Sequence, residues 1–188
     1  MSDNIYAAPS ANLDERLDAD VEGRFYVVST RKLLILFFAT FGLYQLHWNF
    51  QNWLLHKRAT GEDVWPLPRA LFAIFFTHTL YREIAAYDST GDRRTWDSEI
   101  YASGMVFMLF IGYALSWVGT DSRLIDLASL LLLIPIGLLL KTVQVEVNIR
   151  SGDPSGSSND SFTAANIAWC VIGGVVWFFA AIGLLFIP

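Results

Sequence analysis

The sequence is poor in the residues that build soluble domains and reactive sites. Only 16% of its 188 residues are charged, well under the roughly 25% typical of soluble domains. Cys170 is the single cysteine, which excludes an intramolecular disulfide and a cysteine-based metal cluster. Its position inside an apolar run favours a small buried hydrophobe. The N-terminus has no basic segment followed at once by an apolar core, so we expect no cleavable signal peptide.

Catalytic and nucleotide-binding motifs are also missing. The sequence contains no H-E-x-x-H, G-x-S-x-G, Walker or dinucleotide-binding pattern. The three histidines, His47, His56 and His78, are not spaced to fix a metal ion. No pair of carboxylates lies inside an apolar run, so no proton relay is evident. We therefore predict no catalytic residues, no metal and no cofactor.

What the sequence does have is apolar and aromatic residues, at 54% and 15% of the chain respectively, with aromatics counted in both. Long uncharged runs with aromatic flanks are typical of proteins that cross a lipid bilayer. We predict an all-α fold, an integral membrane helical bundle with four transmembrane helices and one further marginal or re-entrant helix. The expected segments are an acidic, mobile tail at 1–24 and a membrane domain at 25–188, with helices near 30–56, 67–86, 100–119, 122–145 and 163–187.

The first predicted membrane helix, residues 30–56, is apolar in its first half and carries polar residues in its second half. Ser29 is placed to cap its first turn, and residues 33–55 carry no formal charge over a length that spans the ~30 Å apolar layer. Its second half carries uncharged polar residues on one face, which cannot meet acyl chains cheaply. They either hold helices together near the interface or line a ligand or transport path. The path candidates are Gln45, Asn49, Asn52 and His56, together with His78 and Arg82 from the next helix.

The remaining segments leave some questions open. The apolar centre of 67–86 is short, so this helix either spans, re-enters or lies in the interface. Pro135 predicts a kink in the fourth helix, and 143–150 fits a strand or a helical continuation. Residues 151–161 are all turn formers, which predicts a loop. Gly173 and Gly174 leave one side of the last helix without side chains.

The distribution of Lys and Arg indicates how these helices are oriented, because basic residues concentrate on the cytoplasmic side. With five spans and the N-terminus inside, nine of the 13 basic residues lie inside and four outside. If 67–86 does not cross, the better orientation places the N-terminus outside, with eight basic residues inside and five outside. The count favours five spans but leaves the orientation open.

One segment resembles a known family. The run from Thr40 to Trp53 resembles the signature T-x-G-(I/L)-Y-x-(I/L)-Y-W-x-Y-(K/R)-N-W of a bacterial inner-membrane family whose domain has no known function. Four further pieces resemble its members: 68–70 with the Phe-rich run after it, 81–84, 143–148, and 162–163 with Asn166 ahead of two glycines. The resemblance covers most of 26–185. His47 and Gln51 replace the usual Tyr and basic residue, which weakens the basic inner face that would favour an outside N-terminus.

The resemblance implies a bacterial inner-membrane location and no activity, so it transfers no catalytic or binding residues. We expect the lipid bilayer as a partner, together with another membrane protein or a second copy of the chain. The acidic tail argues against nucleic acid as a partner, because it would repel it. The leading hypothesis is a non-enzymatic scaffold or accessory subunit. The alternatives are a small transporter or channel lined by the polar face, and an interfacial lipid-acting enzyme using His56, His78 and Glu83.

Overall fold

The computed structural model describes residues 23–91, 94–117 and 123–186, and all regular structure in these ranges is helical. The all-α prediction is therefore confirmed for this part of the chain. The tail predicted at 1–24 lies, except for its last two residues, outside the described residues. The helices are α2 (Thr30–Ala39), α3 (Tyr44–Thr60), α4 (Pro66–Leu71), α5 (Ala73–Ala86), α6 (Ser98–Trp117), α7 (Arg123–Arg150), the short 3-10 helix η1 (Ser157–Asn159) and α8 (Ala164–Phe186).

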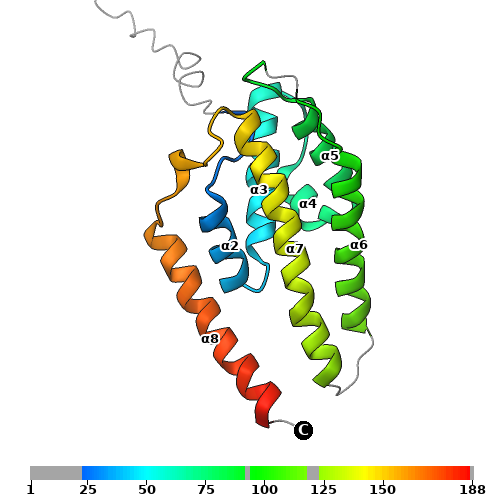
Figure 1. The fold of residues 1–188 in the computed structure, drawn as a ribbon, viewed down its shortest axis with the longest axis vertical. Coiled ribbons are helices and arrows are strands. Elements are labelled where there is room, and N and C mark those ends of the chain that lie inside the picture. Colours follow the sequence, from blue (N-terminus) through cyan, green and yellow to red (C-terminus); the bar gives the residue numbers. More distant parts are fainter. Residues whose placement is uncertain (1–22, 92–93, 118–122, 187–188) are drawn as a thin grey trace, which may run out of the picture.

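The prediction of one continuous helix over 30–56 is wrong. The chain turns between α2 and α3, where Phe41 and Gly42 both have positive φ, 53° and 82°. The amide of Gly42 donates to the carbonyl of Phe37 at 2.8 Å, which closes the end of α2. The Thr40 hydroxyl donates to the Leu36 carbonyl and accepts from the amide of Tyr44, which opens α3. Two successive left-handed residues reverse the chain, so α2 and α3 form a hairpin (Figure 1).

The segment before α2 lies alongside α3 and confirms this reversal. The amide of Tyr26 donates to Asn52, and the Arg24 side chain donates to His56, both in α3. Ser29 caps α2 as predicted, accepting from the amide of Lys32 at 3.2 Å. Because α2 has only 10 residues, about 15 Å of helix, it cannot cross the apolar layer of a bilayer.

The helix predicted at 67–86 is also divided, at Phe72, into α4 and α5. Pro66 opens α4 at a position where a missing amide hydrogen costs nothing. The 14 residues of α5 extend about 21 Å, less than the apolar thickness of a bilayer. Large apolar side chains are nevertheless exposed along α4 and at the start of α5, and they are Trp65, Leu67, Leu71, Phe72 and Phe75.

Three helices, rather than the four expected, are long and apolar enough to cross a membrane in the described ranges. They are α6, α7 and α8. α6 packs antiparallel against α7, and α8 packs against α2 on the opposite side of the hairpin (Figure 1). α7 runs through Pro135 without interruption for 28 residues, so 143–150 is helical and not a strand.

The buried core lies at one end of these three helices. We call this end the crown and define it as residues 24–91 together with 142–163. Its largest buried side chains include Phe25, Phe37, Trp48, Trp53 and Tyr81. By contrast, only 6% to 17% of the apolar windows of α6, α7 and α8 is buried. The crown therefore holds the fold together, while the three long helices expose the surface that a bilayer would cover.

Candidate functional site

Three amide side chains hold the extended segment before α2 between α3 and α7. Asn52 accepts from the amide of Tyr26 at 3.1 Å. Gln144 donates to the carbonyl of Tyr26 at 3.0 Å, and Asn148 donates to the carbonyl of Val28 at 3.0 Å. We call Asn52, Gln144 and Asn148 the amide clamp. All three have 0% exposure, so they supply the hydrogen bonds that water would otherwise give this backbone.

The clamp is closed by bonds among its own members and their neighbours. Gln144 accepts from the indole of Trp48, and its amide nitrogen donates to Asn148 at 2.6 Å. Asn52 donates to the carbonyl of Trp48 at 2.8 Å. Each clamp amide therefore uses both its oxygen and its nitrogen. A buried polar network that is this well satisfied fixes one arrangement of its elements.

The structure buries the predicted path residues of α3 instead of lining a cavity with them. Gln45 contacts the sulfur of Met105 at 3.4 Å, and Asn52 belongs to the clamp. Asn49 is 4% exposed and its side-chain nitrogen has no hydrogen-bond partner. His56 is fully buried beside the segment before α2. None of the four lines either of the two cavities described below.

His56 belongs to a chain of polar contacts that joins the segment before α2 to α3 and α5. Its Nδ1 accepts from Arg24 at 3.3 Å, and its Nε2 lies 3.3 Å from Glu62. Arg24 also forms an ion pair with Glu83 at 2.6 Å. Arg24 thus joins two residues of the enzyme hypothesis, and this contact could not be found from their spacing. The third, His78, is turned toward α6.

The two α5 candidates contact α6. His78 Nε2 lies 3.3 Å from the hydroxyl of Ser103, and Arg82 forms a 3.1 Å ion pair with Glu99. Arg82 also approaches the carbonyl of His78, not its imidazole. The six candidates are therefore divided between the inside of the crown and the α5–α6 surface.

Sequence reasoning missed the polar residues at the end of α7. Arg150 donates to the carbonyls of Ala85, Tyr87 and Arg94, so it ties the loop after α5 to α7. Glu146 lies 3.6 Å from Arg150 and 3.3 Å from Arg94. The sequence feature that could have indicated these residues is the alternation of polar residues at 144, 146, 148 and 150. This alternation fits a strand as well as a helix.

The loop between α7 and α8 is stabilised by a carboxylate. Asp153 accepts from the amides of Ser158 and Ser157 at 2.8 and 3.0 Å, and from the hydroxyls of Ser155 and Ser157. These bonds, the amide of Ser158 first, hold the pKa of Asp153 well below its ordinary value. The ordered loop then binds α2, because Asn159 and the carbonyl of Ser161 accept from Lys32.

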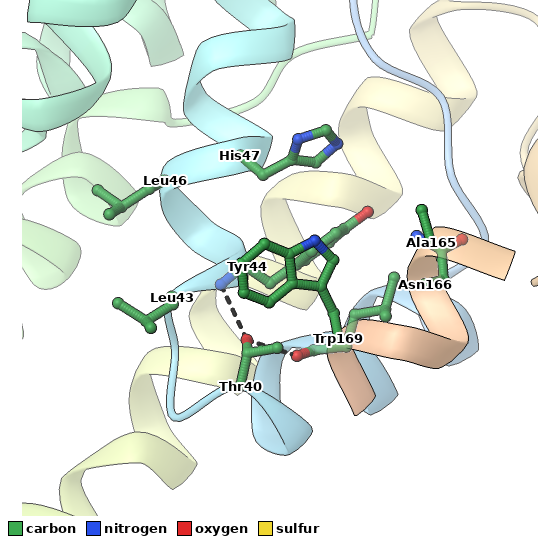
Figure 2. A pocket seen from close by; sticks show the side chains of 9 residues that line it. Thr40, Leu43, Tyr44, Leu46, His47, Ala165, Asn166 and Trp169 are labelled. Atoms are coloured by element: carbon green, nitrogen blue, oxygen red, sulfur yellow. Dashed lines mark hydrogen bonds between the residues drawn. The ribbon is translucent and has the colours of Figure 1, made fainter. Parts of the chain in front are cut away.

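Two cavities open on the surface of the long helices. One, of about 500 Å³, lies along α6 and α7 and is bordered by apolar residues and Thr142. The other, of about 390 Å³, lies between the α2–α3 hairpin and the start of α8 (Figure 2). We call the second the α8 crevice, and it is lined by Leu36, Thr40, Leu43, Tyr44, Leu46, His47, Ala165, Asn166 and Trp169.

No group of three or more His, Cys, Asp or Glu side chains that could hold a metal ion occurs among the described residues. Comparison of the chain with protein-family models, curated proteins and solved structures finds no match. Most polar groups singled out above contact other parts of the same chain. The α8 crevice differs in that polar side chains, among them His47 and Asn166, line its open space.

Proposed function

We propose that this protein is a non-enzymatic accessory subunit, or scaffold, of a bacterial inner-membrane assembly. The buried polar groups of α3 and α7 support this role, because they are used to hold the crown together. The resemblance of the α3 region to an inner-membrane family supports the location. The transporter and lipid-enzyme alternatives receive no comparable support from the arrangement of the described residues.

The observation that carries the proposal is the isolation of α8. This helix packs mainly against α2, and most of its apolar surface is exposed. Val171, Val175, Phe178 and Phe179 are each more than half exposed. α6 and α7, in contrast, pack along each other. We propose that α8 is the helix that a transmembrane segment of a larger partner protein contacts, through close van der Waals packing.

The distribution of charge gives the proposed orientation. Among the described residues, most Lys and Arg side chains lie on the crown, and Lys141 directly precedes its second segment. Arg94 lies just outside the defined ranges but contacts the crown through Glu146 and Arg150. Arg123 begins α7 at the opposite end. Because basic residues are retained on the cytoplasmic side, we propose that the crown faces the cytoplasm. The three spans then place the C-terminus on the opposite side of the membrane.

Photo-crosslinking in native membranes tests the role. A photoreactive phenylalanine analogue at Phe178 is expected to give one discrete adduct with a different membrane protein, confirmed by a reciprocal crosslink from that protein. The same analogue at Phe107, an equally exposed position on α6, is the control and is expected to give lipid adducts.

Two results would contradict the proposal. An adduct of twice the 21.2 kDa mass of the chain would assign α8 to self-association instead. Robust turnover or transport by the purified protein would show that it is not an accessory subunit.

A further inference from the structure

The α8 crevice combines an apolar wall with hydrogen-bond donors at one end. Its apolar lining comes from Leu36, Leu43, Leu46 and Trp169. No Asp, Glu, Lys or Arg lines it. Figure 2 shows the indole of Trp169 in front of Tyr44 in this view, with His47 above them on α3. A ligand for this space must therefore be largely apolar, uncharged where it enters, and polar at one end.

The polar groups of the crevice are left with unused donors. The hydroxyls of Tyr44 and Tyr26 lie 3.3 Å apart and share one hydrogen bond, so one hydroxyl hydrogen is unused. Asn166 uses its side-chain oxygen to accept from the amide of Thr163, and its side-chain nitrogen has no partner among the described residues. His47 contacts the rings of Tyr26 and Tyr44, but its ring nitrogens have no hydrogen-bond partner in the described structure.

The position of the crevice sets its depth in a bilayer. Ala165, Asn166 and Trp169 belong to the first turns of the candidate span Ala164–Gly183, directly after the polar loop that ends at 163. This level corresponds to the boundary between headgroups and acyl chains, where aromatic side chains concentrate. At this depth, the ester carbonyls of lipids are hydrogen-bond acceptors within reach of the unused donors.

We propose that the α8 crevice is a binding site for one glycerolipid of the bilayer. Its ester carbonyl accepts from His47 and from the free donor of Asn166 or the tyrosine pair, and one acyl chain lies against Leu43, Leu46 and Trp169. The site lies between the α2–α3 hairpin and α8. The bound lipid therefore adds contacts between these elements, where α8 otherwise packs mainly against α2. The proposal does not depend on a protein partner, because the crevice lies on the α3 side of α8.

Native mass spectrometry of the full chain in detergent tests this site. The delipidated protein is titrated with a phosphatidylglycerol of defined chain length, and one saturable binding event is expected. Ala165→Phe, which fills the crevice, is expected to abolish that event. Ala164→Phe, an exposed neighbour that does not line the crevice, is the matched control and is expected to bind as the natural protein does.

A second variant separates hydrogen bonding from filling of the space. His47→Leu keeps an apolar wall but removes the donor, and it is expected to weaken binding about tenfold, as loss of one hydrogen bond to a bound ligand does. Melting of each variant in detergent without lipid is measured alongside, so that a folding defect is recognised.

Each remaining outcome overturns the proposal. Equal binding by the natural protein, Ala165→Phe and Ala164→Phe would show that the lipid is only part of the bulk shell. Saturable binding of a long-chain quinone, with none of the phosphatidylglycerol, would assign the crevice to a different carbonyl-bearing molecule. Equal binding by His47→Leu would show that the ester is not recognised there.

Discussion

The indole of Trp177 in α8 donates a 2.8 Å hydrogen bond to the carbonyl of Phe38, in the last turn of α2. One turn earlier in α8, Gly173 lies directly against the carbonyl of Ala39. The final carbonyls of a helix have no partner within that helix, and exposure of them to acyl chains is costly. α8 therefore covers the end of α2, a helix too short to cross the apolar layer of a bilayer.

Gly173→Ala is expected to destabilise this contact, because a Cβ at 173 would lie 1.7 Å from the carbonyl oxygen of Ala39. Backbone atoms on both sides must then separate, and such overpacking costs about 1–3 kcal/mol. Denaturant unfolding in detergent measures the loss. Gly174→Ala is the control, since nothing lies within 4 Å of its Cβ position, and it is expected to be neutral or slightly stabilising. Equal effects of the two variants would contradict this account of the α2–α8 contact.

The amide clamp gives a second prediction. Asn148→Ala removes bonds to both backbone groups of Val28 and to Gln144, at 0% exposure. Leaving these groups buried and unpaired is expected to lower the free energy of unfolding by about 2–4 kcal/mol.

Asn49→Leu is the matched comparison for the clamp. Its side-chain nitrogen is buried without a partner, so an apolar residue of similar size is expected to cost under about 1 kcal/mol or to stabilise. Both variants are measured by unfolding in the same detergent. If Asn49→Leu lowered the free energy of unfolding more than Asn148→Ala, the polar face of α3 would have a role other than the structural one described here.

Asp153 predicts how the loop after α7 responds to acid. Its pKa is lowered in the folded chain, so the stabilisation is fully present above the ordinary carboxyl pKa and is lost as the pH falls from about 4 through the folded value. Asp153→Asn is expected to increase amide hydrogen exchange at Ser157 and Ser158 near neutral pH. The difference from the natural protein should shrink below about pH 4. An unchanged difference across this range would show that the carboxylate charge does not hold the loop.

Hydropathy and charge were enough to predict that the described part of the chain is helical, and to predict the approximate ranges of α6, α7 and α8. They did not show the reversal at Phe41 and Gly42, because a run of apolar residues looks the same whether it crosses a bilayer or turns back. The reversal depends on contacts far along the chain. Phe41 stacks on Trp177 at 4.0 Å, and α8 covers the end of α2.

The contacts of the candidate site residues also depend on segments far apart in the sequence. The sequence pattern showed that uncharged polar residues share one face of 44–56. Their partners, however, lie before α2 and at the end of α7. Asn52, for example, accepts from the amide of Tyr26. Sequence spacing describes which residues share a helix face, and it does not say which distant segment packs there. The partners of Gln144 and Asn148 could not be found in the sequence for that reason.

Residues 30–60 form a hairpin, so that, among the described residues, we propose α6, α7 and α8 as the helices that cross the membrane. Cysteine labelling with an impermeant reagent tests it in a Cys170→Ser background, using Lys57→Cys, Arg94→Cys and Arg123→Cys one at a time. Positions 57 and 94 are expected to label from the cytoplasmic side, and position 123 from the opposite side. Labelling of 57 and 94 from opposite sides would mean that the chain crosses the membrane between them, and that the hairpin does not enter and leave on one side.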